Sequence, residues 1–501
     1  MKTPKAGMLI LSCFLLVSSQ GSMYAQKKVG ALTFETVRPT AGNGQEIVYK
    51  DKNNQEVKVE YGTLVVPERH DKPDGNTIEL AFFRLKSVST SPGSPIVFLE
   101  GGPGLPGTNA YYGPIMELLI PLREVGDVII LDQRGTGHTK PRMTCPNKPN
   151  TVSEQAATYE ALLNDSRERS RKCAESLRSQ GIDLSAYNMN ESADDLEDLR
   201  IALGAKKISL LGFSGGATLA LATLRRHGPN LDRVVMAGIE GTAHMNKLPS
   251  NIQKQLVKID ALVKADPEIS KLVPDLLGLM KSVLDKFEKE PVTIELTDSK
   301  TKQKFKVKIG KYVLQGITAL MIGTTDKISL LPIFYYALSK GDASLLTQLI
   351  NRLNNRTISD ATAALMDCAS GVSKERQSQI RREAGETLLG DAINFPFPEG
   401  CDVWGNPDLG DSYRSQVDSS VPTLLISGTL DGFTPVNNAE EVAKGLPNSV
   451  HMIVDGGGHE DLLVGTQKAK EVILEFMKGA PVSTKSIGFP PIKFKTIKGQ
   501  G

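Results

Sequence analysis

The sequence predicts an α/β protein with a mostly parallel central sheet, flanked by helices and interrupted by a large, mainly helical insertion. Short runs that are apolar on both faces, at 96–99, 128–131 and 208–211, are typical of central parallel strands covered by helices. This pattern stops after Ile239 and resumes at Thr423, with helix-spaced apolar residues in between. A length of 501 residues exceeds one compact core, which also favours a large insertion or a second unit.

The N-terminus has the pattern of a secretory signal peptide, which we place at residues 1–25. Lys2 and Lys5 precede an apolar stretch at 8–17 that is too short to span a bilayer, and small and polar residues follow up to Ala25. Cleavage after Ala25 would send the protein to the periplasm or the medium. A lipoprotein anchored through Cys13 is the less favoured alternative, because apolar residues continue beyond that cysteine.

The composition is that of an ordinary soluble globular protein. Hydrophobic residues make up 40% of the chain and charged residues 23%, and the formal net charge is only +2. Such a balance gives no reason to expect a nucleic-acid partner or, once the signal peptide is removed, a stable association with a membrane surface. The sequence does not indicate an oligomeric state.

The remaining elements follow from local patterns. Alternating apolar residues at 56–67 and 78–85 indicate antiparallel strands at the edge of the sheet. Inside the insertion, 292–296 and 305–309 have the pattern of a small hairpin. We divide the chain into the signal peptide (1–25), a first core segment (26–240), a helical cap insertion (241–405), a second core segment (406–479) and an extended basic tail (480–501).

Four cysteines remain after signal cleavage, an even number in a compartment that favours disulfides. Their order suggests the pairs Cys145–Cys173 and Cys368–Cys401, although four cysteines allow three pairings. Each bond would close a loop of about thirty residues, worth ~3–4 kcal/mol in the chain-entropy model. A metal site is the alternative, but no Cys-x-x-Cys or histidine spacing supports it.

The strongest functional signal is Gly212-Phe213-Ser214-Gly215-Gly216, which stands between an apolar strand and a run of small, helix-compatible residues. A strand, a tight turn and a helix with a serine at the apex form the setting of a nucleophile elbow. The flanking glycines are needed because side chains there would collide with the crossing strand and helix. A five-residue pattern also occurs by chance, so its meaning depends on an acid and a histidine in the right order.

An acid and a histidine do follow, each after a predicted strand. Asp431 comes after the strand that ends at Ser427, and His459 stands in a glycine-rich loop after the last strand. Taken alone, the aspartate would be a turn former and the histidine a solvated side chain, and His138 is a rival base. The order Ser214, Asp431, His459 is nevertheless that of the α/β-hydrolase triad. We therefore expect a serine nucleophile, a histidine base and an aspartate that orients the imidazole.

The loop Gly101-Gly102-Pro103-Gly104 follows the first parallel strand, where this fold supplies one backbone N–H of the oxyanion hole. Pro103 has no N–H, so Gly102 is the expected donor. The second expected donor is the N–H of the residue after the nucleophile, Gly215. A plain Gly-Pro turn is the alternative for this loop taken in isolation.

Together these motifs resemble the prolyl and tripeptidyl aminopeptidase family of α/β-hydrolases, from about Tyr61 to Met477. The resemblance rests on Gly101-Gly102-Pro103-Gly104, Asp132-Gln133-Arg134-Gly135-Thr136-Gly137, Gly212-Phe213-Ser214-Gly215-Gly216, Gly428-Thr429-Leu430-Asp431 with Thr434-Pro435, and Gly458-His459. Cys368 and Cys401-Asp402-Val403-Trp404 are similar to signatures of the secreted tripeptidyl aminopeptidase branch. The resemblance implies the same triad and the same oxyanion donors.

The resemblance also assigns Asp132 and Arg134 a structural role, as a buried ion pair that ties the loop after their strand. This chain departs from the family at two positions: Gly215 replaces an aromatic residue, and Leu105-Pro106 replaces a further glycine. Both positions line the substrate pocket in the family. Hydrolase activity is therefore a firmer expectation than peptidase activity.

The sequence thus predicts an exported serine hydrolase, and an aminopeptidase that acts on free peptide N-termini through an acyl-enzyme is the favoured form. An esterase or other acyl hydrolase with the same triad is the alternative. A non-catalytic binding protein of this fold is less favoured, because it would have little reason to keep all three triad residues. An aminopeptidase must bind a free α-ammonium, for which Glu240 and Glu100 are the candidates. The expected partner is a peptide or small acyl substrate, with no metal or other cofactor.

Overall fold

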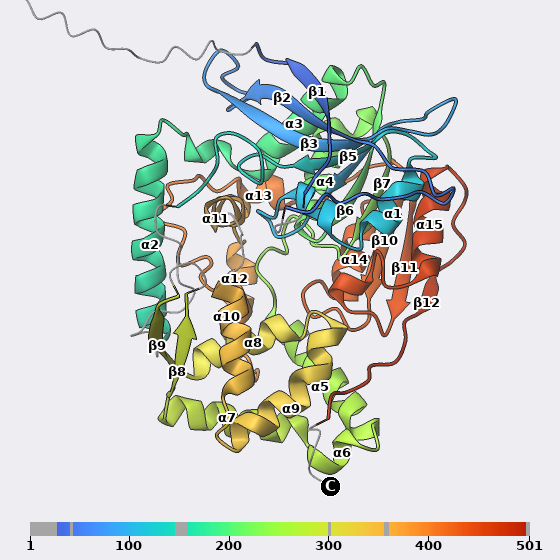
Figure 1. Ribbon diagram of the computed structural model, residues 1–501. Coiled ribbons are helices and arrows are strands. Elements are labelled where there is room, and N and C mark those ends of the chain that lie inside the picture. Colours follow the sequence, from blue (N-terminus) through green and yellow to red (C-terminus); the bar gives the residue numbers. More distant parts are fainter. Residues whose placement is uncertain (1–27, 41–43, 146–157, 299–301, 355–359, 497–501) are drawn as a thin grey trace, which may run out of the picture.

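The structure is a computed structural model that describes residues 28–40, 44–145, 158–298, 302–354 and 360–496 (Figure 1). The predicted signal peptide at 1–25 lies outside the described residues. In these ranges, no helix combines the length and the apolar content that a bilayer crossing requires.

The described strands form one large sheet and one small hairpin. The ten strands of the large sheet are, in spatial order, β1 (Leu32–Val37), β2 (Val59–Pro67), β3 (Thr77–Leu85), β5 (Val128–Asp132), β4 (Ile96–Leu99), β6 (Ile208–Phe213), β7 (Leu231–Ala237), β10 (Thr423–Gly428), β11 (Ser449–Asp455) and β12 (Ser486–Gly488). Strands β1, β2, β3 and β5 pair antiparallel, and every pair from β5 to β12 is parallel. The predicted mostly parallel sheet with antiparallel strands at one edge is confirmed.

Helices cover both faces of this sheet, which explains why its central strands are apolar throughout. The helices of the sheet region are α1 (Met116–Leu122), α2 (Tyr159–Ser179), α3 (Met189–Ala202), α4 (Gly215–His227), α14 (Val436–Ala443) and α15 (Gln467–Met477). On β4, Val97 and Leu99 pack in a core with α3 and α4. Ile96 and Phe98 of the same strand face the other way and pack in a second core with α1 and α15. Burial on both faces leaves no polar alternation to read in such a strand.

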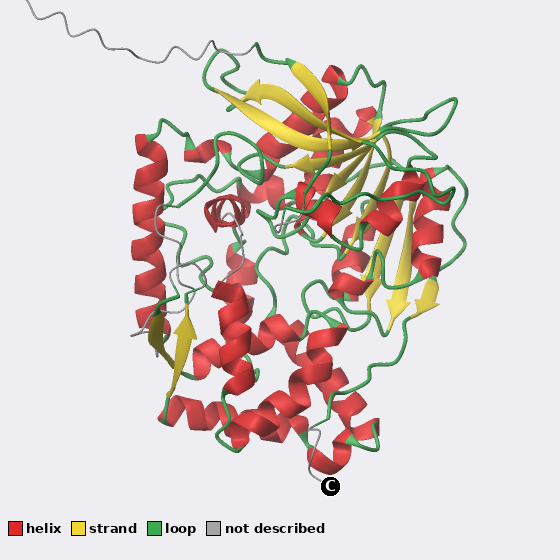
Figure 2. Ribbon diagram, viewed as in Figure 1, coloured by secondary structure: helices red, strands yellow, loops and turns green. Residues whose placement is uncertain are grey.

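The chain between β7 and β10 is mainly helical and forms a layer beside the carboxyl ends of the sheet strands (Figure 2). It contains α5 (Pro249–Ala265), α6 (Ile269–Leu272), α7 (Leu276–Lys289), β8 (Val292–Thr297), β9 (Lys304–Ile309), α8 (Lys311–Met321), α9 (Thr325–Ser339), α10 (Ser344–Asn354), α11 (Asp360–Ser370), α12 (Lys374–Ala384) and α13 (Gly410–Arg414). The predicted hairpin is the antiparallel pair β8 and β9. Most of these elements share an apolar core of their own, to which α5, α7, α8 and α9 contribute.

Helix α11 is different, because it packs against the sheet region. Met366 lies in the core of α3 and α4, and Thr362 donates a hydrogen bond from Oγ1 to the Gly135 carbonyl at 2.9 Å. Disulfides join Cys145 to Cys173 and Cys368 to Cys401, the pairing suggested by their order. All four cysteines belong to one apolar cluster around Trp404, so the two bonds fasten α2 and α11 to the same place.

The C-terminal tail ties the two regions together. After β12 pairs with β11, Ile492 and Phe494 pack against the core of the helical layer, and the Lys495 N–H donates to the Ser329 carbonyl of α9 at 3.0 Å. Figure 1 shows this extended path from the edge of the sheet down to the helices.

Candidate active site

Ser214 occupies a strained turn between β6 and α4. Its φ and ψ angles are 55° and −120°, a conformation that L-residues rarely adopt, and its N–H donates to the Ala237 carbonyl at 2.9 Å. A Cβ on Gly216 would overlap the Leu99 carbonyl of β4, which accounts for a glycine two positions after the serine. The turn is therefore built to project the serine beyond the carboxyl end of the sheet, as a nucleophile elbow does.

Asp431 and His459 lie together on neighbouring loops, after β10 and β11. The imidazole Nδ1 of His459 is 2.7 Å from Asp431 Oδ2, and the aspartate is 0% exposed. Its Oδ1 accepts from the Phe433 and Thr434 N–H groups at 2.8 and 2.9 Å, and its Oδ2 accepts from Thr434 Oγ1 at 2.6 Å. A carboxylate bound in this way keeps the proton on Nδ1 and leaves Nε2 as the acceptor.

The imidazole of His459 lies beside the serine turn. Its ring centroid is 4.8 Å from that of Phe213, the residue before the serine, and 5.3 Å from that of Phe433. A Cβ on Gly238, which follows β7, would come within 2.7 Å of His459 Cε1, so only glycine leaves room for the ring there. The structure thus brings the base and its acid to the same edge of the sheet as Ser214.

The glycine loop after β4 packs directly against the serine turn. A Cβ on Gly101 would lie 3.4 Å from Ser214 Oγ, and a Cβ on Gly215 would lie 3.4 Å from the Gly102 nitrogen. Gly215 is the first residue of α4, so its N–H has no acceptor within that helix. The two expected oxyanion donors therefore lie on adjoining backbone segments next to the serine. A side chain at 215 would point at the Gly102-Pro103 peptide, which explains the absence of an aromatic residue there.

The helical layer contacts the histidine loop at the turn between α8 and α9. The Gly323 carbonyl accepts the His459 N–H at 2.6 Å, and Thr325 Oγ1 donates to Asp461 Oδ2 at 2.8 Å. A Cβ on Gly323 would overlap the ring of Phe433, which itself packs edge-on against the imidazole. The position of His459 thus depends on both regions of the chain.

The expected ion pair between Asp132 and Arg134 is wrong. Asp132 accepts from the N–H groups of Thr108 and His138 at 2.8 and 2.7 Å. Arg134 is 0% exposed and forms a two-bond pair with Asp195 of α3, at 2.6 and 2.8 Å. The two side chains have different partners: Asp132 binds backbone N–H groups of neighbouring loops, whereas Arg134 points toward α3. Both roles remain structural.

His138 does not reach the site. Its ring lies 6.1 Å from that of Tyr61 on β2 and 6.5 Å from that of Phe83 on β3. These strands belong to the antiparallel edge of the sheet, away from the serine turn. The rival base is thereby separated from Ser214, and His459 is the histidine beside it.

Two family models match the chain on the segments that form this site. One, described as "alpha/beta hydrolase fold", matches residues 94–263, and one, described as "TAP-like protein", matches residues 392–483. The first covers the glycine loop and the serine turn, and the second covers Asp431 and His459. The chain has the α/β-hydrolase fold, and the two models together support an α/β-hydrolase peptidase family. With its serine elbow and aspartate–histidine pair, the protein is a serine hydrolase.

The similarity to two of the curated relatives extends over most of the chain. YuaR of Escherichia coli (strain K12) is 25% identical over 81% of this chain and 83% of its own length. Serine protease Hip1 of Mycobacterium tuberculosis (strain H37Rv) is 22% identical over 88% of this chain and 90% of its own. A tripeptidyl aminopeptidase of Streptomyces coelicolor is 29% identical over a shorter region, 32% of this chain and 31% of that protein.

This hydrolase has a cavity of about 200 Å³ between the glycine loop and the helical layer. It is lined by Gly102, Glu240, Met245, Asn246, Lys247, Asp367, Ile393, Asn394, Phe395 and Phe397. Gly102 is the oxyanion-loop glycine, residues 240–247 follow β7, and Asp367 lies on α11. The cavity therefore begins at the expected oxyanion donor and extends beneath the helices.

The two glutamates expected from the sequence have different surroundings. Glu240 is 2% exposed, lines the cavity and forms an ion pair with Lys247 Nζ. Glu100 is not among the lining residues, and its Oε1 accepts from the Gly101 N–H at 2.9 Å. Burial raises the pKa of the Glu100 carboxyl. Only Glu240 is therefore brought to the cavity, whereas Glu100 supports the glycine loop.

Asp367 and Asn246 are among the polar residues of the cavity that the sequence did not predict. Both belong to segments whose position depends on how the insertion packs, and neither stands in a recognisable motif. The one local signal is Cys368, which follows Asp367 and fixes its helix through a disulfide.

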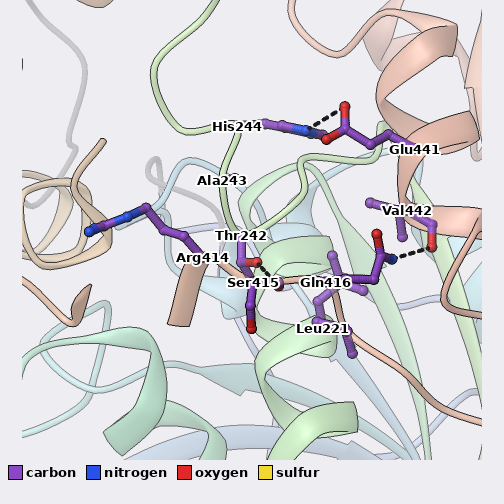
Figure 3. A pocket seen from close by; sticks show the side chains of 10 residues that line it. Leu221, Thr242, Ala243, His244, Arg414, Ser415, Gln416, Glu441 and Val442 are labelled. Atoms are coloured by element: carbon purple, nitrogen blue, oxygen red, sulfur yellow. Dashed lines mark hydrogen bonds and ion pairs between the residues drawn. The ribbon is translucent and has the colours of Figure 1, made fainter. Parts of the chain in front are cut away.

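The loop after β7 is anchored on the side that faces away from the cavity. There a smaller pocket of about 50 Å³ separates it from α13 and α14 (Figure 3). His244 Nδ1 accepts the Gly241 N–H at 3.1 Å, and its Nε2 is 3.2 Å from Glu441 of α14. The hydrogen bond from His244 lowers the pKa of Glu441. One face of this loop is thus pinned to the core while the other presents Glu240 and Asn246 to the cavity.

Among the described residues, the side chains of His70, Glu191 and Asp194 have the mutual spacing of a metal site. They already have partners: His70 Nδ1 is 2.6 Å from Glu191 Oε2, and Asp194 pairs with Arg226 and His227. Although burial opposes protonation, bonds to Asp198 and Glu191 raise the pKa of His70 to about 9. The cluster fastens the β2–β3 turn to α3 by internal ion pairs.

Proposed function

We propose that this serine hydrolase is an exported aminopeptidase that releases amino acids or short peptides from free peptide N-termini. The observation that carries the proposal is the cavity that leads from Gly102 beneath the helical layer and is lined by acidic side chains. A peptide that reaches the serine turn from this side ends within the cavity, where buried carboxylates favour a cationic terminus. The names of two relatives, a serine protease and a tripeptidyl aminopeptidase, agree with a peptide substrate.

In the proposed reaction, Ser214 Oγ attacks the scissile carbonyl carbon while His459 Nε2 takes the hydroxyl proton. Asp431 holds the Nδ1 proton and stabilises the imidazolium. The N–H groups of Gly102 and Gly215 bind the oxyanion of the tetrahedral intermediate. The C–N bond then breaks, His459 gives its proton to the leaving amine, and an acyl-Ser214 ester remains. Water, deprotonated by the same histidine, hydrolyses that ester and frees the serine.

The proposal extends to the organisation of the chain. Residues 26–240 and 406–479 form the hydrolase core, 241–405 form the cap over the site, and the described part of the tail, 480–496, joins the two. Export through a signal peptide at 1–25 agrees with two disulfides, which form and persist in oxidising compartments. Glu240 contributes negative charge to the substrate cavity, and Glu100 orders the oxyanion loop.

The test compares an unblocked peptide with its N-acetylated twin, beside a short-chain aryl ester. Products are identified by mass spectrometry, and the Ser214→Ala variant is the control for contaminating activity. We expect trimming of the free peptide and little cleavage of the acetylated one, both absent from the variant. Equal cleavage of both peptides would indicate an endopeptidase, and turnover of the ester alone would indicate an esterase with the same triad. Either result would refute the aminopeptidase.

A further inference from the structure

Five polar side chains line the cavity, and three of them, Glu240, Lys247 and Asn394, have partners within the protein. Glu240 pairs with Lys247 Nζ. Asn394 accepts the Lys247 N–H at 2.6 Å through Oδ1 and donates to the Lys247 carbonyl at 2.9 Å through Nδ2. These contacts fasten the loop after β7 to the cap. They leave Glu240 paired with a cation and both polar atoms of the Asn394 side chain hydrogen-bonded.

The other two side chains, Asn246 and Asp367, are not satisfied in this way. Asn246 is 4% exposed, and its Oδ1 has no hydrogen-bond partner among the described residues. The carboxylate of Asp367 likewise takes part in no hydrogen bond or ion pair within the described ranges. Burial and the charge of Glu240 raise the pKa of Asp367 to about 7. Both groups are acceptors. Leaving the buried Asn246 oxygen without a donor costs about 1–3 kcal/mol unless a ligand supplies one, and the half-buried Asp367 carboxylate lines the same cavity.

The charge of the cavity indicates the charge of the ligand that would bind there. Two carboxylates, Glu240 and Asp367, face one ammonium, Lys247, so the ionised cavity has one uncompensated negative charge. A ligand that donates several hydrogen bonds and carries one positive charge would satisfy both acceptors at once. A primary ammonium group has three N–H donors and no acceptor, which matches this set.

We propose that Asp367 and Asn246 bind the α-ammonium group of the substrate. This inference rests on the proposed aminopeptidase activity and names the residues that read the peptide N-terminus. Glu240 is not the primary anchor, because Lys247 already neutralises it. The apolar walls formed by Met245, Ile393, Phe395 and Phe397 contact the side chain of the terminal residue, so apolar N-terminal residues are favoured over charged ones.

The anchor is held at a fixed position relative to the serine turn. Helix α11, which carries Asp367, is fastened by the disulfide of Cys368 and by the Asn406 side chain, which donates to the Leu365 carbonyl at 2.7 Å. The loop that carries Asn246 is fastened at its far side by His244 and Glu441 (Figure 3). A rigid anchor for the ammonium group fixes how many residues lie between the N-terminus and the cleaved bond. We therefore expect fragments of one length from substrates of different sequence.

The test measures kcat/KM for the free peptide in Asp367→Asn, a variant of the same size without the charge. We expect a loss of about 10- to 100-fold, mainly through KM, because a hydrogen bond to a charged group is lost. Turnover of an aryl ester without an ammonium group should not change. Asp391→Asn is the matched control, since that carboxyl is also in the cap and has a pKa raised by burial, but does not line the cavity.

A second variant keeps the proposal testable if Asp367→Asn does not fold. Asn246→Ala removes an oxygen without a protein partner, so KM for the free peptide should rise about 5- to 10-fold without loss of ester turnover. If the wild type distinguishes free from acetylated peptide and both variants keep the same preference, the anchor assignment is wrong and the aminopeptidase stands. If the wild type shows no preference, the proposed function itself fails. Mixed fragment lengths from one substrate would also overturn the rigid anchor.

Discussion

The two ends of the site differ in how their buried carboxylates are satisfied. At the catalytic end, Asp431 accepts hydrogen bonds from Phe433, Thr434 and His459, all supplied by the protein. In the cavity, the buried Asn246 oxygen has no such donor among the described residues, and the half-buried Asp367 carboxylate forms no hydrogen bond or ion pair within them. Reaction groups that are bonded before substrate arrives are pre-organised for charge that develops in the transition state. Acceptors without donors are instead available for a ligand. We therefore assign the reaction to the end that contains Asp431 and the binding of the substrate to the cavity.

The two ends also differ in where their residues come from. Asp431, His459 and Ser214 stand on loops at the ends of core strands, which the sheet holds in register. Asp367 and Asn246 belong to α11 and to the loop after β7, which disulfide and side-chain contacts fasten individually. We therefore expect the core to position the reacting groups and the insertion to select the substrate.

The largest expected effect on activity comes from removing the hydrogen bond between Asp431 and His459. In Asp431→Asn, the amide would place an N–H donor opposite Nδ1 and favour the wrong imidazole tautomer, lowering kcat by about 10⁴-fold. The loss should be equal for peptide and ester, since both need the base. Steady-state kinetics on the two substrates measure it. A variant that lost only peptide turnover would place Asp431 in recognition and reverse the comparison.

The next effect tests whether the cap also contributes to the catalytic end. In Gly323→Ala, the added Cβ overlaps the Phe433 ring, which packs against His459, so kcat should fall about 10- to 100-fold on both substrates. Gly316→Ala is the matched control in the preceding helix, because its Cβ would meet nothing nearer than the Ala392 carbonyl at 3.7 Å. Equal activity of the two variants would show that the α8–α9 turn does not position the base.

A smaller effect is expected in the cavity, where removal of the Asp367 charge should raise the free energy of unfolding. The folded pKa of Asp367, about 7, lies above its ordinary value, so the ionised carboxylate destabilises the ligand-free fold once the pH exceeds that ordinary value. Glu240, Lys247 and Tyr413 are the titratable groups that face it. Asp367→Asn should therefore unfold with a free energy higher than wild type by about 1–2 kcal/mol at pH 8, and nearly equal to it at pH 4. Denaturant titration at both pH values checks this, and a less stable variant at pH 8 would contradict it.

The smallest effect concerns a satisfied cluster outside the site. Because the pKa of His70 is raised to about 9, its stabilising contribution is complete below about pH 6.5 and is lost as the pH rises through 9. It is faced by Glu191, Asp195 and Asp198 and by the guanidinium of Arg134. The unfolding free energy should drop by about 1 kcal/mol between pH 7 and pH 10. His70→Asn should remove most of that drop, and an unchanged profile would show that the imidazole is not charged in the fold.

The meeting of Ser214, Asp431 and His459 at one edge of the sheet could be predicted from the sequence, because these residues stand at recognisable places in the chain. Ser214, Asp431 and His459 each follow an apolar strand, and parallel strands bring their carboxyl ends to one edge. The disulfide pairs followed from the order of the cysteines in the same way. These inferences needed only local patterns and the rules of sheet topology.

The cavity and the buried arginine could not be predicted in this way. Asp367 and Asn246 acquire their position from the packing of helices whose apolar faces do not specify neighbours. Arg134 pairs with Asp195, an acid on a covering helix, although the adjacent motif offered Asp132. In each case the partner is chosen by tertiary packing of distant segments, which one-dimensional patterns do not record.

We propose that Ser214 is a nucleophile activated by His459 and Asp431. The most direct test is a fluorophosphonate probe, with the labelled residue identified by mass spectrometry in the wild type, in His459→Ala and in urea-unfolded protein. We expect rapid labelling of Ser214 in the folded wild type and almost none in the other two. Failure to label the folded protein, or equal labelling after removal of the histidine, would contradict this proposal.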